Sequence, residues 1–198
     1  MKDGYRQFRD DIVKGLNDNG VKYKLFGGVV VSLIDEKRET EDLDIFVEAS
    51  IYNVDRFINA LMSCGFCEEK LLAETIYGNG EKTSASFIGS IRLDSDQDKW
   101  LNFHLDLCYE IGKYNYDTVN AEEYWDGGVK LIIVPFLDIA KMKANVHVNF
   151  ISGPPRQKDI EDIQAIAKYL GLDPATGKPV QEESGFKSFF KRIFSRGN

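Results

Sequence analysis

The sequence predicts an α+β protein built on a mixed β-sheet flanked by helices, with a further helical segment at the C-terminus. Its 198 residues suffice for one α/β domain with a small helical annex. Segments near both ends show the apolar spacing of helices, whereas the middle shows the alternation of strands. Several predicted strands follow one another without an intervening helix, which favours a mixed sheet over a repeating βαβ fold.

Composition and charge narrow the classes of function. The formal net charge of -7 argues against extended DNA binding, but it leaves room for a nucleotide triphosphate held in a local pocket. No apolar run reaches the roughly 20 residues of a bilayer span. The first residues carry acids and no apolar core, so we expect no secretory signal and a cytoplasmic location. The three cysteines, an odd number, favour a reducing compartment, and Cys64 and Cys67 fit a helix end better than a zinc site.

The first half of the chain is expected to alternate between helices and strands. Phe8, Ile12 and Leu16 recur at helical spacing within a helix over 5–18. The other expected elements are a strand over 21–26, a turn at Gly27-Gly28, a short helix over 29–34, a strand over 43–48, and a helix over 53–65 that Asn53 caps and Gly65 ends.

The second half is expected to supply the remaining strands and two helices. The expected elements are a hairpin region over 66–96 with its turn at 78–80 and a strand over 86–93, strands over 100–110 and 130–135, and helices over 136–150 and 156–171. We therefore predict one domain over residues 1–171, a linker over 172–185 rich in Pro, Gly and Glu, and a basic amphipathic tail helix over 186–198.

Three aspartates are the candidate metal ligands. Asp42 and Asp44 are two residues apart on a predicted strand, so both carboxylates project from one face while Leu43 and Ile45 enter the core. Asp106 lies in the otherwise apolar strand LNFHLDLCY, where a charge calls for a partner. If the two strands are neighbours, three carboxylates converge, and Mg²⁺ or Mn²⁺ would offset their repulsion.

A less specific interpretation of these acids stays open. Asp42 could belong to the solvated acidic turn EKRETED, and Asp106 could pair with a lysine. Gly27-Gly28 by itself is typical of a turn, although glycines between a strand and a helix also let the backbone approach a triphosphate. The order of strand, Gly-Gly, helix, D-x-D and a later strand aspartate favours the functional interpretation.

The segment FGGVVVSLIDEKRETEDLDIFVE resembles the signature of the nucleotidyltransferase (DNA polymerase β-like) superfamily. Its R-x-T-x-D-L-D form resembles minimal bacterial branches such as the AbiEii-type toxins and the antibiotic nucleotidyltransferases. The resemblance covers roughly residues 20–170. It implies a nucleotidyltransferase fold, a metal pair on Asp42 and Asp44, and Asp106 as a third carboxylate that is a general base or a metal ligand.

The later helices extend the resemblance. KMKAN resembles the MK-x-A helix of AbiEii-like members, and RQKDIEDI resembles their R-x-K-D-x-x-D segment. The nucleotide-binding residues implied in this way are Gly27, Gly28, Thr40, Lys143 and Arg156. For Lys141 and Lys143 a solvated helix face is the alternative, and Asp162 is expected to be a structural partner of Asp159.

The leading hypothesis is a magnesium-dependent transfer of a nucleoside monophosphate from a nucleotide triphosphate to an acceptor. The acceptor is open: a small molecule, as in antibiotic modification, an RNA such as the tRNA target of a toxin–antitoxin pair, or a protein. A non-catalytic nucleotide-binding or scaffold module with the same fold is the alternative. The basic tail would allow contact with a membrane surface, a partner protein or this domain itself.

Overall fold

A computed structural model describes residues 4–66, 90–94, 103–149 and 156–172. The chain divides into two compact units, Met1–Pro135 and Phe136–Asn198, and this division falls inside the single domain predicted over 1–171. The predicted hairpin turn at 78–80, the linker over 172–185 and the tail helix over 186–198 lie outside the described residues.

The first unit is built on a mixed sheet of six strands in the order β3-β4-β2-β1-β8-β7. β2 runs parallel to β4 and β1 parallel to β8, while the other neighbours are antiparallel. A separate hairpin pairs β5 with β6. The elements are α1 (Tyr5–Asp18), β1 (Tyr23–Leu25), α2 (Gly28–Val31), β2 (Asp42–Val47), α3 (Ile51–Ser63), β3 (Ser90–Asp94), β4 (His104–Cys108), β5 (Glu110–Ile111), β6 (Tyr114–Asn115), β7 (Glu122–Asp126) and β8 (Val129–Ile133).

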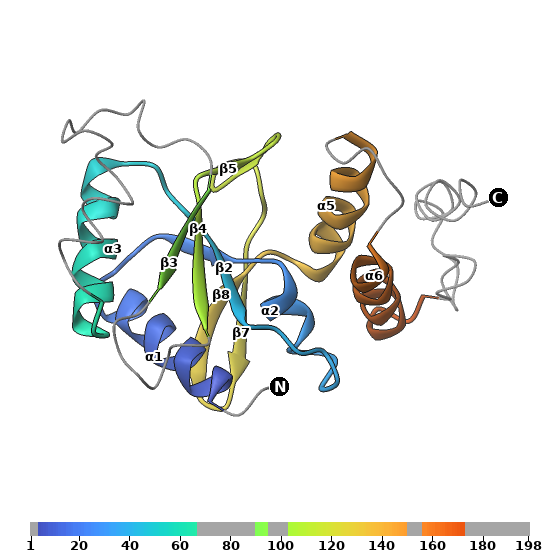
Figure 1. Ribbon diagram of the computed structural model, residues 1–198, viewed down its shortest axis with the longest axis horizontal. Helices are drawn as coiled ribbons and strands as arrows, with labels where there is room; N and C mark the ends of the chain where they lie inside the picture. Colours follow the sequence, from blue (N-terminus) through green and yellow to red (C-terminus); the bar gives the residue numbers. More distant parts are fainter. Residues whose placement is uncertain (1–3, 67–89, 95–102, 150–155, 173–198) are drawn as a thin grey trace. The chain divides into compact units, whose positions relative to one another are not determined.

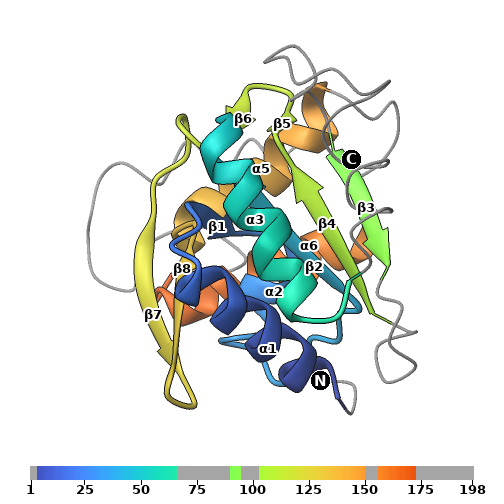
Figure 2. The ribbon, with the colours of Figure 1, turned by 90° about the vertical axis from the view of Figure 1, so that its left-hand side faces the viewer.

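Helices α1 and α3 cover one face of this sheet, and α2 lies on the opposite face (Figures 1 and 2). The apolar positions of α1 are buried, as their helical spacing predicts: Phe8, Ile12 and Leu16 are all fully buried. Leu43 and Ile45 of β2 are equally buried. The prediction of a mixed sheet flanked by helices is therefore confirmed.

Three short strands were not predicted from the sequence. β5 and β6 have two residues each, too few to show any period. β7 reads Glu-Glu-Tyr-Trp-Asp and lies at the edge of the sheet, with Trp125 exposed. An edge strand with charged residues on it lacks the apolar alternation by which half-buried strands are recognised.

Asn53 does not cap helix α3, contrary to the prediction. The helix begins at Ile51 after an extended Ser50, so Asn53 lies inside its first turn and is 2% exposed. Its Oδ1 accepts the Lys22 N–H at 2.7 Å, and its Nδ2 donates to the carbonyls of Lys22 at 3.0 Å and Glu48 at 3.1 Å. The amide therefore ties the residue before β1 to the residue after β2.

We expect Asn53→Ala to lower the free energy of unfolding by about 2–3 kcal/mol, because the substitution leaves part-buried backbone groups without their partners. Urea unfolding measures the loss. Gln7→Ala is the matched control, since Gln7 makes an exposed bond to Asp11, and it should cost under about 0.5 kcal/mol. Equal losses for the two variants would contradict the assigned role of Asn53.

The second unit contains two described helices, α5 (Phe136–Asn149) and α6 (Gln157–Tyr169), close to the predicted bounds. The rings of Phe136 and Tyr169 pack at 4.9 Å between centroids and join the start of α5 to the end of α6. Within the described ranges of both units, every helix is too short or too polar to cross a bilayer.

Candidate active site

The parallel pairing of β2 with β4 brings two of the predicted carboxylates together. Asp44 lies directly opposite Asp106 in the register, and Asp42 lies opposite His104. Neighbouring strands are about 4.8 Å apart, and residues at opposed positions project from the same face. β2 and β4 are therefore neighbours, as the predicted approach of Asp106 to Asp42 and Asp44 requires.

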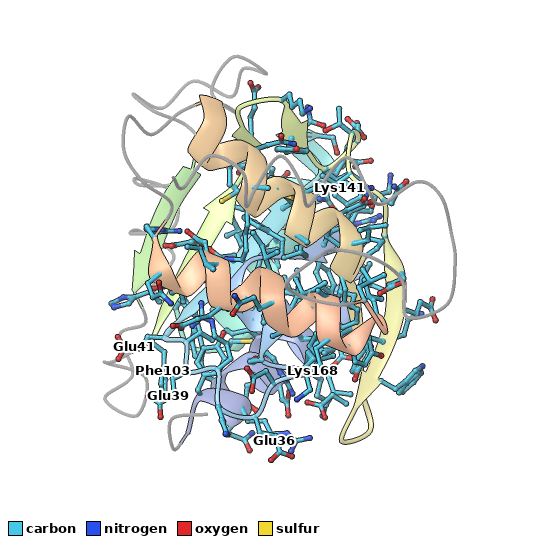
Figure 3. The ribbon with its side chains drawn as sticks, turned by 90° about the vertical axis from the view of Figure 1, so that its right-hand side faces the viewer. Glu36, Glu39, Glu41, Phe103, Lys141 and Lys168 are labelled. Carbon is cyan, nitrogen blue, oxygen red and sulfur yellow. The ribbon has the colours of Figure 1, made fainter. Side chains whose placement is uncertain are left out.

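Asp42 is the first residue of β2 and does not belong to the acidic turn that precedes it. That turn carries Glu36, Glu39 and Glu41 along the loop that leads from α2 into β2 (Figure 3). Glu36 and Glu39 are exposed, whereas Asp42, Asp44 and Asp106 are each half-buried. The solvated-turn interpretation thus does not describe the position of Asp42.

The carboxylate face of the two strands changes from polar to apolar along its length. Beyond Asp44, Phe46 is fully buried and stacks on Phe26 with 4.1 Å between ring centroids. Opposite Phe46 lies Cys108, which is 2% exposed. The Asp44–Asp106 pair therefore lies where the half-buried end of this face meets its apolar end, and the low polarity nearby strengthens its electrostatic interactions.

Burial raises the pKa of the Cys108 thiol, and the charges of Asp44 and Asp106 raise that pKa further. A thiol with a raised pKa stays protonated at neutral pH and is a poor nucleophile or metal ligand. We infer that Cys108 contributes packing to this face.

The two glycines at the start of α2 make room for neighbouring side chains: Gly27 precedes the helix and Gly28 is its first residue. Gly27 has φ 72° and ψ -146°, a backbone conformation that essentially only glycine adopts. A Cβ on Gly27 would collide with the Asp44 carboxylate, and one on Gly28 would lie 2.8 Å from Nη2 of Arg38. Gly-Gly therefore has a reason in this fold that does not depend on a nucleotide, which the sequence pattern alone did not reveal.

Thr40 lies at the same end of β2 and is 8% exposed. Its Oγ1 accepts the Asp42 N–H at 3.3 Å and donates to the Asp42 carbonyl at 3.2 Å. Thr40 thus shapes the entry to β2. Tyr5 of α1 also donates to the Asp42 carbonyl, at 2.8 Å. Nothing in the sequence indicated this bond, because it joins residues 37 positions apart.

The donor set suits a hard divalent cation. Asp44 and Asp106 offer carboxylate oxygens from directly opposed positions, and Asp42 offers a third on the same strand face. Across the ranges that the structure describes, no three His, Cys, Asp or Glu side chains are placed to hold a metal ion together, so the predicted convergence of three carboxylates into a complete ligand set is not found. Mg²⁺ does not require one, because it commonly takes one or two carboxylates and completes its shell with water and phosphate oxygens.

The comparisons with known proteins bear on the fold. No protein-family model matches the sequence, and no curated protein sequence is significantly similar to it. The structure is similar to that of an antigenic nucleotidyltransferase-like protein from Paracoccidioides brasiliensis, with a TM-score of 0.59 and 15% identity, over 99% of this chain and 88% of that one. The chain has a nucleotidyltransferase-like fold.

A second similar structure is JHP933 from Helicobacter pylori, with a TM-score of 0.46 and 16% identity, over 85% of this chain and 68% of that one. At these identities the likeness concerns the fold alone. The resemblance to the AbiEii-type branch therefore stays a prediction, as do the roles of the individual site residues.

Lys143 and Arg156 belong to the second unit, where both contact Asp159. Lys143 Nζ lies 2.9 Å from Asp159 Oδ1 and 2.8 Å from Asp162 Oδ2, and its side chain is 12% exposed. Arg156 Nε donates to Asp159 Oδ2 at 2.6 Å. The solvated-face interpretation is wrong for Lys143, which joins α5 to α6. Asp162 is a structural partner in this cluster, as predicted.

We expect Gly27→Ala to destabilise the protein by about 3 kcal/mol, since it adds a collision with Asp44 to the strain of a positive φ. Gly20→Ala shows the cost of a positive φ in open space, because Gly20 has φ +62° and nothing lies within 4 Å of its missing Cβ, whereas Gly27 combines its positive φ with ψ -146°. That control should cost about 1 kcal/mol. Urea unfolding compares the two, and equal losses would show that Asp44 does not occupy the space beside Gly27.

We expect Lys143→Met to cost about 3 kcal/mol, because it removes the cation shared by two buried aspartates. Lys141→Met is the control: Lys141 (labelled in Figure 3) pairs with Asp138 at 2.7 Å, but its side chain is 44% exposed. The control should change stability by less than about 1 kcal/mol. Amide hydrogen exchange in α5 and α6 measures both effects, and a Lys143→Met protein with unchanged protection would refute the bridging role.

Proposed function

We propose that this protein is a metal-dependent nucleotidyltransferase that moves a nucleoside monophosphate from a nucleotide triphosphate to an acceptor. The observation that carries the proposal is the register of β2 against β4, which sets Asp44 opposite Asp106 with Asp42 on the same strand face. Two opposed carboxylates repel each other, and a divalent cation between them would offset that repulsion. The nucleotidyltransferase-like fold of the similar Paracoccidioides protein supports the same class of reaction.

In this proposal Asp44 and Asp106 hold the divalent ion, with Asp42 as a further ligand. Mg²⁺ or Mn²⁺, when bound, supplies positive charge that neutralises the triphosphate and the departing pyrophosphate. An oxygen of the acceptor attacks the α-phosphorus, and the bond from that phosphorus to the oxygen bridging it to the β-phosphorus breaks. The acceptor proton passes to a carboxylate, for which we propose Asp106, and pyrophosphate leaves with the bridging oxygen.

The proposed nucleotide contacts differ in how available they are. Gly27 is half-buried beside the Asp44 carboxylate, Gly28 is buried beside Arg38 and Thr40, and Thr40 holds the first peptide of β2. Arg156 keeps 55% of its side chain exposed beside Asp159. Lys143 would have to exchange a bond to Asp159 or Asp162 for one to a phosphate. We therefore expect Arg156 to contribute more to nucleotide affinity than Lys143.

The acceptor is proposed only as a class. The net charge of -7 disfavours a long phosphate backbone and favours a small hydroxylated molecule over an extended RNA. A tRNA end or a protein side chain presents the same nucleophilic oxygen and enters the acceptor panel on equal terms.

The test measures pyrophosphate release with each of the four ribonucleoside triphosphates, Mg²⁺ or Mn²⁺, and a panel of small-molecule, RNA and protein acceptors. We expect metal-dependent release that Asp44→Asn and Asp106→Asn each reduce by a factor on the order of 10³, because each removes a charge while keeping the shape of the side chain. Glu36→Gln is the matched control, since it removes an exposed charge from the loop before β2, and it should leave the rate within about two-fold.

Two results would overturn this proposal in different ways. Turnover that survives both aspartate substitutions would refute the site. Nucleotide binding by calorimetry with no turnover on any acceptor would favour the non-catalytic nucleotide-binding module instead.

A further inference from the structure

Tyr5, near the start of α1, contacts the entries of both strands that carry the carboxylates. Its side chain is fully buried, and its hydroxyl donates to the Asp42 carbonyl at 2.8 Å. Its ring packs edge-on against Phe103 with 5.6 Å between centroids. Asp42 opens β2, and Phe103 directly precedes β4. One side chain therefore touches the chain where each of these two strands begins.

The contact is specific in its chemistry. The Tyr5 hydroxyl is a donor placed 2.8 Å from a carbonyl oxygen, which can only accept. A buried tyrosine hydroxyl needs such a partner, so the bond to Asp42 is expected to persist.

Helix α1 is itself held in place by ion pairs to β7 and by packing on Phe103. Arg9 is fully buried and its Nη2 lies 2.6 Å from Asp126 Oδ2, while Arg6 Nη2 lies 2.7 Å from Asp126 Oδ1. The Phe8 ring stacks on Phe103 at 5.4 Å between centroids. These contacts fix α1 against β7 and Phe103. Through its hydrogen bond from Tyr5, the helix therefore also restrains the Asp42 peptide.

We propose that Tyr5 is a positioning residue for the carboxylate pair: it fixes the entries of β2 and β4, and thereby the spacing of Asp44 and Asp106. The inference rests on the proposed function, because the spacing matters only if the pair binds a cation. Tyr5 touches neither the substrate nor the ion in this role. It acts through the Asp42 peptide and through Phe103.

The test compares Tyr5→Phe with Tyr23→Phe in the full chain. Tyr23 is 2% exposed and its hydroxyl donates to Asn17 Oδ1 at 3.0 Å, so the control also removes one buried, hydrogen-bonded hydroxyl. Mn²⁺ is the probe, without nucleotide, and electron paramagnetic resonance reports the bound ion. Asp44→Asn shows which part of the signal arises at the proposed site.

We expect Tyr5→Phe to weaken Mn²⁺ affinity about five-fold, the effect of one net hydrogen bond. Tyr23→Phe should keep the affinity within about two-fold, even though thermal unfolding registers a loss of stability in both variants. Hydrogen exchange without metal is the second readout: amides over 41–44 should exchange faster in Tyr5→Phe alone. Tyr5→Leu, which also removes the ring, should weaken Mn²⁺ binding further.

The outcomes separate this inference from the proposed function. Mn²⁺ affinity unchanged in Tyr5→Phe, with Asp44→Asn defective, would overturn the positioning role and leave the metal site standing. Equal weakening by Tyr5→Phe and Tyr23→Phe would reduce the effect to general stability and would also overturn it. A wild-type protein that binds no Mn²⁺ would overturn both proposals together.

Discussion

Asp44 and Asp106 carry like charges at directly opposed positions of two parallel strands, and the candidate site is organised around that pair. Parallel strands cannot slip by one residue without turning every side chain to the other face. Leu43, Ile45 and Leu105 are fully buried, so their packing holds the register that opposes the aspartates. The core residues stabilise an arrangement that the carboxylates alone would disfavour.

Residues around this pair leave space for its side chains or hold its backbone in place. The Asp44 carboxylate occupies the space where a side chain on residue 27 would lie, and the Arg38 guanidinium does the same at residue 28. The hydroxyl of Thr40, two residues before Asp42, donates to the Asp42 carbonyl, and the hydroxyl of Tyr5 in α1 donates to the same carbonyl. The first peptide of β2 is thus held from two directions. Such support around a charged pair is what a preorganised ligand site requires.

The second unit handles charge differently. Lys143 pairs with Asp159 and Asp162, and Arg156 pairs with Asp159, while both aspartates are almost fully buried. A buried cluster of this kind is strongly disturbed when one member is removed. The helix pair therefore depends on residues that the family resemblance assigned to nucleotide binding, and Lys143 in particular is first of all a structural residue here.

Local pattern alone determined much of this protein: the amphipathic helix over 5–18, the parity that sets Asp42 and Asp44 on one strand face, and the turn at Gly27-Gly28. These follow from spacing within one segment, where backbone geometry leaves few choices. Only the tertiary structure decided that β4 lies parallel to β2, that Asn53 joins two strand ends and not a helix cap, that Lys143 bridges α5 and α6, and that Tyr5 reaches Asp42. Each of these contacts joins residues that are distant in the sequence. The periodicity of a segment indicates its secondary structure, but it does not indicate which distant segment packs against it.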